Sequence, residues 1–177
     1  QLIQTWLQAV LQSDQFEVSF LAGDASFRRY ARIKLNNKSY MLMDAPPEKE
    51  DCAPFVSIDE FFDQHGVRVP HIVAKDLGLG FLLLEDFGDV VLSTLLNDET
   101  VDQYYAQSFK QLIELQQVDG RDHLPAYSYE KLMSEMRLLT DWMLPSLNIQ
   151  ATEQQLETIE QAFDFLTMEA LSQPQVI

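Results

Sequence analysis

The hydrophobic periodicity of this chain becomes helical throughout after Gly88, and this change constrains the fold more than any other feature. Before it, short segments alternate apolar and polar residues and are separated by turn residues, which is the pattern of half-buried strands. After it, apolar residues recur every three or four positions, as in amphipathic helices. The sequence therefore predicts an α+β protein in which a short connector joins a strand-rich lobe to a helical lobe.

Five strands are predicted in the first part, at residues 16–20, 30–35, 39–43, 67–76 and 80–84. Hairpin turns between the first three indicate an antiparallel meander. The fifth is almost wholly apolar, which favours an interior position. One helix is predicted before the strands, at residues 2–12, and another at residues 54–65, with Phe55, Ile58 and Phe62 on one face and Gly66 after its end.

Three amphipathic helices are predicted in the second part. The first has an apolar stripe over residues 101–115 and Asp98 as its N-cap; the second has a stripe over residues 132–143 and is ended by Pro145. The third begins with the capping box Thr152-x-x-Gln155 and ends before Pro174. Residues 175–177 have the pattern of a strand. The aromatic and methionine side chains of the stripes are expected in the core.

The formal net charge is −16, from 12 basic and 28 acidic residues, which argues against a nucleic-acid or anionic-membrane partner. The basic side chains between residues 23 and 49 form one island: Arg28, Arg29, Arg32, Lys34, Lys38 and Lys49. Such an island could hold a small anion such as a nucleotide phosphate, or could consist of solvated side chains on a strand pair. The single cysteine excludes an internal disulfide and a cysteine-built zinc site. Neither a signal-peptide pattern nor an apolar run of membrane-spanning length is found, so a cytoplasmic protein is expected.

Three segments occur in an order that is informative as a set: Leu21-Ala22-Gly23-Asp24-Ala25-Ser26-Phe27-Arg28-Arg29-Tyr30, Met43-Asp44-Ala45-Pro46-Pro47-Glu48-Lys49-Glu50-Asp51 and Phe81-Leu82-Leu83-Leu84-Glu85-Asp86-Phe87-Gly88. With them the chain resembles the aminoglycoside phosphotransferase-like family, which has the protein-kinase-like fold. Within that family it is similar to the bacterial anomeric kinases that act on N-acetylmuramate and N-acetylglucosamine. The resemblance covers the whole chain, but only about the first half of a family member.

The resemblance implies a nucleotide-covering N-lobe at residues 1–84, a hinge at residues 85–89 and the helical start of a C-lobe at residues 90–177. It implies an ATP-dependent kinase that phosphorylates the anomeric hydroxyl of a small amino sugar in cell-wall recycling. Two alternatives stay open. One is a related phosphotransferase acting on an aminoglycoside or on choline, and the other is a non-catalytic module that binds a nucleotide or a partner protein.

The nucleotide site that the resemblance implies has two parts. The loop of Gly23, Asp24, Ala25, Ser26 and Phe27 lies between the first two strands, where the family covers the nucleotide phosphates. Gly23 would permit an unusual backbone angle there, and an ordinary hairpin turn is the alternative. The second part is the hinge, in which Glu85, Asp86 and Phe87 would hold adenine, chiefly through the main chain of Glu85 and Phe87.

The third strand contains no lysine, although this fold usually places a phosphate-binding lysine there, and the matching stretch includes Met43. We hypothesise that Arg28, Arg29 or Arg32 reaches the phosphates instead, because a guanidinium can bind a phosphate bidentately. The acids that could pair with this cation are Glu48, Glu50, Asp51 and Glu60.

The family's catalytic loop is a His-x-Asp segment with an Asn five residues after the Asp, and residues 1–177 contain no such segment. The resemblance places it, and a further Asp that holds Mg²⁺, beyond Ile177. We therefore expect neither a catalytic residue nor a metal ligand in this chain, and no activity from it alone. We also expect self-association through the face that the rest of the kinase would cover.

Overall fold

The computed structural model describes residues 1–23 and 26–176, and the chain divides into two compact units, residues 1–111 and residues 112–177. Helix α3 (Val101–Gln116) crosses the boundary between them. None of the helices in the described part is both long enough and apolar enough to cross a membrane. The predicted limits of the N-lobe, hinge and C-lobe stay predictions.

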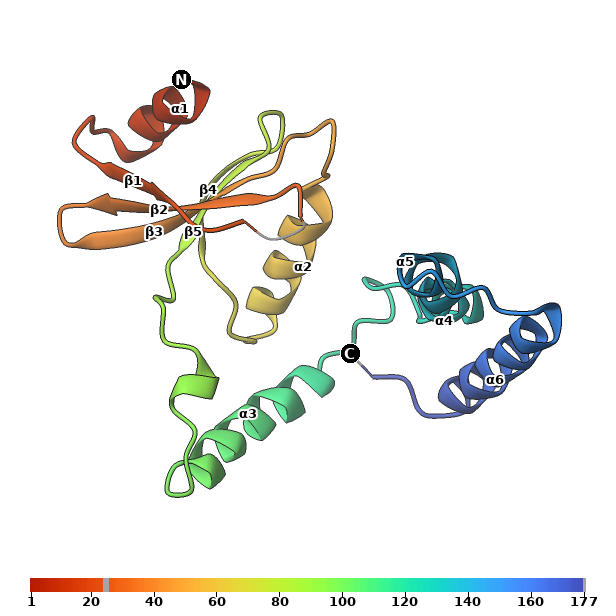
Figure 1. The fold of residues 1–177 in the computed structure, drawn as a ribbon. Helices are drawn as coiled ribbons and strands as arrows, with labels where there is room; N and C mark the ends of the chain where they lie inside the picture. Colours follow the sequence, from red (N-terminus) through yellow and green to blue (C-terminus); the bar gives the residue numbers. More distant parts are fainter. Residues whose placement is uncertain (24–25, 177) are drawn as a thin grey trace. The chain divides into compact units, whose positions relative to one another are not determined.

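A five-stranded antiparallel sheet is the main element of the first unit (Figure 1). Its strands are β1 (Glu17–Phe20), β2 (Arg29–Leu35), β3 (Lys38–Asp44), β4 (Ile72–Asp76) and β5 (Phe81–Glu85). They lie in the order β1-β2-β3-β5-β4. The predicted α+β class is confirmed, and so is the interior position of the apolar strand, because β5 pairs with both β3 and β4.

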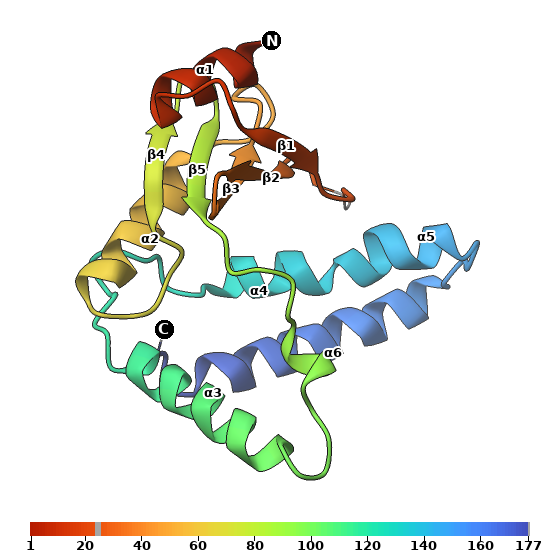
Figure 2. The same ribbon diagram turned by 90° about the vertical axis from the view of Figure 1, so that its left-hand side faces the viewer.

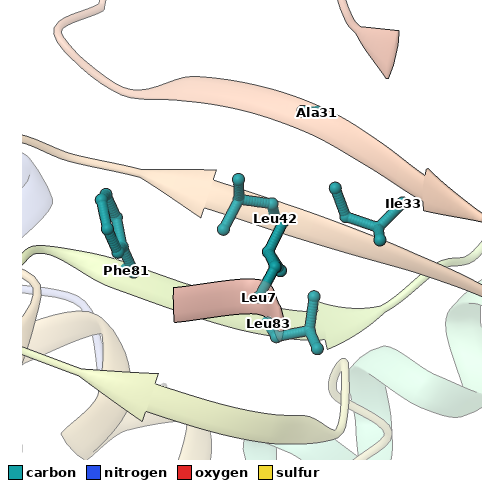
Figure 3. Close-up of a cluster of buried hydrophobic side chains, with 6 residues drawn as sticks. All are labelled: Leu7, Ala31, Ile33, Leu42, Phe81 and Leu83. Carbon is teal, nitrogen blue, oxygen red and sulfur yellow. The ribbon is translucent and has the colours of Figure 1, made fainter. Parts of the chain in front are cut away.

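Two helices cover opposite faces of this sheet (Figure 2). Helix α1 (Leu2–Leu11) inserts Leu7 among buried side chains from β2, β3 and β5, namely Ala31, Ile33, Leu42, Phe81 and Leu83 (Figure 3). Helix α2 (Ala53–Gln64) packs on the alternate residues of β3 and β5, with Val56 beside Met43, Leu82 and Leu84. We call these the α1 face and the α2 face. Since successive strand residues point to opposite faces, each side chain of the sheet is assigned to one of them.

The inward side of α2 agrees only in part with the predicted one, since Phe55 packs on the α2 face but Ile58 does not. Cys52, Val56 and Asp59 are buried, whereas Ile58 is 37% exposed. Cys52 and Val56 are four residues apart and both pack against the α2 face, which turns Ile58, two positions further on, away from the sheet. The apolar residues alone did not predict this orientation of α2, because one of the residues on its inward side is an acid, Asp59.

The fourth strand is also shorter than predicted, since it begins at Ile72 and not at Val67. The N–H of Val67 donates to the carbonyl of Phe62 at the end of α2, and Gly66 has a left-handed φ of 76° there, as expected for the residue after a helix. Pro70 has no N–H to give to a strand ladder. The segment before Ile72 therefore completes the helix end and does not extend the sheet.

The helices that follow are α3, α4 (Tyr129–Met136), a π-helical turn η2 (Leu139–Met143), α5 (Leu144–Ser146) and α6 (Glu153–Leu171), preceded by the 3-10 turn η1 (Leu92–Thr94). The predicted capping box of α6 is confirmed, because Thr152 and Gln155 each bond the other's backbone N–H. Two expectations were wrong. The side chain of Asn97, not that of Asp98, accepts from the backbone N–H groups of Glu99 and Thr100 before α3. Pro145 does not end the helix, since it stands in the first turn of α5, where its missing N–H is not needed.

The expected helical core is only partly formed. Met133 and Phe163 are buried where α4 packs on α6, but Tyr105 and Phe109 of α3 are exposed. Within the first unit, none of the described helices and strands packs extensively on α3. Gln175 and Val176 form no strand, because the described residues offer them no neighbouring strand, and Ile177 lies outside the described part.

Candidate functional site

The three candidate arginines lie in three different environments. Arg29 lies opposite Asp44 in the pairing of β2 with β3. It is two residues from Ala31 along β2, so both side chains lie on the α1 face. It forms an ion pair with the Asp44 carboxylate, and its guanidinium lies 5.8 Å from the ring centre of Phe20. Arg29 therefore points away from the α2 face and from Met43.

Met43 occupies the α2 face at the end of β3, opposite Tyr30 of β2. It is fully buried, and the Tyr30 hydroxyl lies 3.5 Å from its sulfur. Met43 belongs to β3, the strand in which the resemblance implies a phosphate-binding lysine. Met43 and Met41, which share this face, carry no charge, so any cation on this side of the site must come from another element.

Arg28 lies beside the start of α2. Its Nε and Nη2 both donate to Glu50 Oε1, at 3.0 and 2.7 Å, and its guanidinium lies 6.0 Å from the ring centre of Phe55. Partial burial disfavours the charged form of Arg28, but the hydrogen bonds that Arg28 donates to Glu50, with the Coulombic attraction of that carboxylate, outweigh this and hold the pKa of Arg28 above its usual value. Of the acids considered, Glu50 is thus the one that pairs with a candidate arginine, whereas Glu60 pairs with Lys75.

The loop between β1 and β2 is described only in part, since Asp24 and Ala25 lie outside the described residues. Ser26 Oγ accepts from the backbone N–H of Arg28, at 3.1 Å, and the exposed ring of Phe27 lies 5.8 Å from Lys49 Nζ. Gly23 does not use the freedom that glycine offers, because its φ is not left-handed and a Cβ added there would meet nothing within 4 Å. The backbone of Gly23 therefore does not require glycine.

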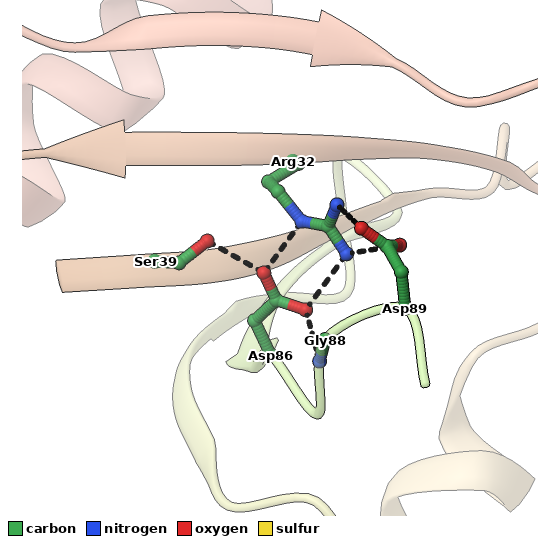
Figure 4. A network of polar contacts seen from close by, with 5 residues as sticks. All are labelled: Arg32, Ser39, Asp86, Gly88 and Asp89. Carbon is green, nitrogen blue, oxygen red and sulfur yellow. Dashed lines mark hydrogen bonds and ion pairs between the residues drawn. The ribbon is translucent and has the colours of Figure 1, made fainter. Parts of the chain in front are cut away.

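Arg32 joins the connector after β5 to the sheet (Figure 4). Its Nε donates to Asp86 Oδ2 at 2.6 Å and its Nη2 donates to Asp86 Oδ1 at 3.2 Å. Asp89 takes two further donors, Nη1 at 2.6 Å and Nη2 at 2.8 Å. These bonds use four of the five N–H donors of the Arg32 guanidinium, and only one N–H, on Nη1, is left outside them.

Asp86 receives hydrogen bonds on both oxygens. Besides Arg32, Ser39 Oγ donates to Oδ2 at 2.5 Å and the backbone N–H of Gly88 donates to Oδ1 at 2.9 Å. The side chain is only 4% exposed. The bond from Arg32, assisted by those from Ser39 and Gly88, lowers the pKa of Asp86 to about 2 against the cost of burial.

Glu85 and Phe87 are held by a second arginine. Arg68 donates to both carboxylate oxygens of Glu85, at 2.8 and 2.5 Å, and its guanidinium lies 4.7 Å from the ring centre of Phe87. The hydrogen bond from Arg68 is the main reason why the pKa of Glu85 is lowered. The main-chain N–H and C=O of Phe87 have no hydrogen-bond partner among the described residues, so a donor and an acceptor are available to a ligand.

Two features of this region were not predicted from the sequence. Asp59 lies on the inward side of α2, where burial, with Asp63 and Glu60 nearby, raises its pKa. The helical spacing of Cys52, Val56 and Asp59, which are four and then three residues apart, could have revealed it. The partnership of Arg32 with Asp86 and Asp89 joins residues more than fifty positions apart, and no local pattern indicates it. Groups of three or more His, Cys, Asp or Glu side chains placed to hold a metal ion do not occur in the described ranges.

Comparisons with known proteins bear on the family and the fold of this chain. The family model described as "Phosphotransferase enzyme family" matches residues 17–177. A protein of Pseudomonas aeruginosa named N-acetylmuramate/N-acetylglucosamine kinase is 39% identical over 156 residues, which are 88% of this chain and 46% of that protein. A protein of Neisseria meningitidis with the same name is 33% identical over 180 residues, 98% of this chain and 53% of that protein. The chain thus spans about half the length of these curated relatives.

Among solved structures, the gentamicin complex of the aminoglycoside phosphotransferase APH(2″)-IIa is similar, with a TM-score of 0.59 at 16% identity. The similarity covers 96% of this chain and 58% of that one. At this identity the likeness extends to the fold, and it agrees with the predicted kinase-like arrangement of a sheet followed by helices.

Proposed function

This chain belongs to the phosphotransferase enzyme family, and from that premise we propose that it is the nucleotide-binding part of an ATP-dependent amino-sugar kinase. The protein would phosphorylate the anomeric hydroxyl of N-acetylmuramate or N-acetylglucosamine, in the cytoplasm, as a step of cell-wall recycling. The observation that carries the proposal is the match along 98% of this chain to a relative named N-acetylmuramate/N-acetylglucosamine kinase.

The hinge would receive the adenine. Hinges of this kind bind the base through main-chain groups, and the N–H and C=O of Phe87 are open to a ligand. The side chains of Glu85 and Asp86 are occupied by Arg68 and Arg32, which leaves recognition of the base to the backbone. The residues of the loop from Gly23 to Phe27 would cover the phosphates.

Arg28 would be the cation that holds the α- and β-phosphates in place of the missing lysine. Of the candidate arginines it is the one that lies beside α2, since Arg29 points to the α1 face and Arg32 donates four hydrogen bonds to Asp86 and Asp89. Glu50 takes only Nε and Nη2 of Arg28, so Nη1 is not engaged by this carboxylate. The acid would orient the guanidinium, as an acid from the helix side orients the phosphate-binding cation in kinases.

In the reaction, the anomeric oxygen of the sugar would form a bond to the γ-phosphorus while the bond from that phosphorus to the β–γ bridging oxygen breaks, releasing ADP. The hydroxyl proton would pass to the carboxylate of the family's catalytic-loop Asp as the new bond forms. Positioning and charge neutralisation supply most of the catalysis of such transfers, and Arg28 would contribute to both. Mg²⁺, where bound, neutralises charge on the β- and γ-phosphates.

The acceptor is tested in the protein as its gene encodes it. We expect ATP-dependent formation of a sugar 1-phosphate from N-acetylmuramate and N-acetylglucosamine, detected by phosphorus coupling of the anomeric proton in NMR spectra. Gentamicin and choline serve as comparison acceptors. Phosphorylation of either of these, and not of the sugars, would replace the proposed substrate class, and ATP binding without turnover of any acceptor would favour a non-catalytic module.

The role of Arg28 is tested by titrating ATP and adenosine into Arg28→Ala, with Arg29→Ala as the matched control. Loss of a charge-assisted contact predicts an ATP affinity lower by about tenfold to a hundredfold in Arg28→Ala. Adenosine, which has no phosphate, should bind unchanged. An unchanged ATP affinity in Arg28→Ala would assign the phosphates to another group.

A further inference from the structure

Asp86 is a buried acid in a connector whose other residues are largely exposed, and its surroundings fix the course of the chain. Its four hydrogen bonds come from β2 (Arg32, twice), from β3 (Ser39) and from the connector itself (Gly88) (Figure 4). We call Arg32, Ser39, Asp86 and Gly88 the hinge clamp. The clamp attaches the connector to two strands at once.

The clamp determines the conformation of Phe87, which lies between its two anchored residues. Gly88 has a left-handed φ of 79°, and its N–H is fixed on Asp86 Oδ1 at 2.9 Å. On the other side, Glu85 is anchored by its N–H on the carbonyl of His71, at 2.8 Å. Phe87 contributes the open main-chain donor and acceptor, so their directions depend on the turn that Asp86 closes.

We infer that Asp86 is a positioning residue for base recognition: by closing the turn onto Gly88 it presents the main chain of Phe87 in the orientation that binds adenine. Asp86 has no free oxygen for a ligand, and it acts through the backbone. The inference rests on the proposed binding of ATP at this hinge. Beyond that proposal, we infer that Asp86 affects the affinity for the base and not the affinity for the phosphates, although its side chain contacts neither.

Asp89 offers a matched control within the same network. It bonds the same guanidinium as Asp86, but its side chain is 78% exposed and it contacts neither Ser39 nor the N–H of Gly88. Asp86→Asn and Asp89→Asn remove the same charge beside Arg32. Only Asp86→Asn also removes the carboxylate that accepts from the N–H of Gly88.

The test compares adenosine and inorganic tripolyphosphate as separate probes, titrated into the wild-type chain and both variants at pH 7. For Asp86→Asn we expect adenosine to bind about tenfold more weakly, the loss that follows if roughly one backbone residue has to be ordered on binding. Tripolyphosphate should bind with wild-type affinity, and Asp89→Asn should bind both probes as the wild type does. If Asp86 were needed only for folding, replacing it would lower the affinity for both probes or for neither.

The outcomes separate this inference from the proposed function. If the wild type binds adenosine and Asp86→Asn binds it equally well, the positioning role is overturned while the nucleotide site stands. If the wild type binds no adenosine, both fail. Ser39→Ala, which removes one bond from Asp86 and leaves its charge, is the second variant should Asp86→Asn fail to fold. It should weaken adenosine binding in the same direction but less, and an unchanged affinity would count against the clamp.

Discussion

Replacing Asp86 by asparagine should change the acid stability of the first unit in a calculable way. The pKa of Asp86 is about 2 in the folded chain, against an ordinary value of 3.8, and hydrogen bonding from Arg32 is the main cause. A group whose pKa is lowered by folding contributes stability above its unfolded value and loses it as the pH falls through the folded value. The contribution of Asp86 is therefore complete above about pH 4 and lost towards pH 2.

The magnitude follows from the two pKa values. A decrease from 3.8 to about 2 corresponds to about 2 kcal/mol of unfolding free energy at neutral pH, and the side chain is buried enough for this to be little screened by solvent. Near pH 3 about half of it should remain. Asparagine has nearly the same size but no charge, so the wild type should exceed Asp86→Asn by about 2 kcal/mol at pH 6 and by little at pH 2.

The chain offers a clean optical probe for this measurement. It has two tryptophans; Trp6 packs on Phe81 in the first unit, with ring centres 5.5 Å apart, and Trp142 is 72% exposed in the second. In a Trp142→Phe background, urea unfolding followed by fluorescence reports on the first unit alone. A stability difference that is independent of pH between 2 and 6 would refute the reasoning, because it would mean that Asp86 contributes through packing and not through its charge.

Two further substitutions test local features of the fold. Gly80→Ala should unfold the first unit or destabilise it by at least about 3 kcal/mol, because an added Cβ would lie 1.8 Å from the carbonyl oxygen of Ala45 and Gly80 has a φ of 71°. Urea unfolding followed by fluorescence measures this, and Gly23→Ala, where a Cβ meets open space, should stay within about 0.5 kcal/mol of the wild type. Thr152→Ala should cost about 1 kcal/mol by removing the N-cap of α6, measured by far-ultraviolet circular dichroism during unfolding. An unchanged unfolding midpoint would mean that the hydrogen bond from the backbone N–H of residue 152 to the Gln155 side chain is enough to cap α6.

The order of the elements could be predicted from the sequence because it depends on local periodicity. The alternation in β1 to β3, the apolar β5 and the capping box at Thr152 are each readable within a few residues. The errors arose where a distant group decides the outcome. Ile58 points outward because Cys52 and Val56 pack under the sheet, and β4 begins late because Val67 completes the end of α2.

The candidate site was predictable to a smaller extent, for the same physical reason. Its segments were identified from the sequence, but the role of each cation depends on a carboxylate far along the chain. Arg28 pairs with Glu50, twenty-two residues away, and Arg32 pairs with Asp86, fifty-four residues away. Neither separation corresponds to a helical or strand period, so only the folded chain brings these groups together.

The basic island of the sequence is therefore not a basic patch in space. Strand alternation sends Arg29 to one face of the sheet and Arg32 to the other, Arg28 lies beside α2 just before β2, and each has its own acidic partner. A small polyanion held here would not be captured by summed positive charge, which the acidic partners largely cancel. It would instead have to be recognised by donors in fixed directions, and Arg28, oriented by Glu50 and not fully occupied by it, is suited to that. On this view the acids beside the arginines increase selectivity for a correctly placed phosphate and reduce non-specific attraction of other anions.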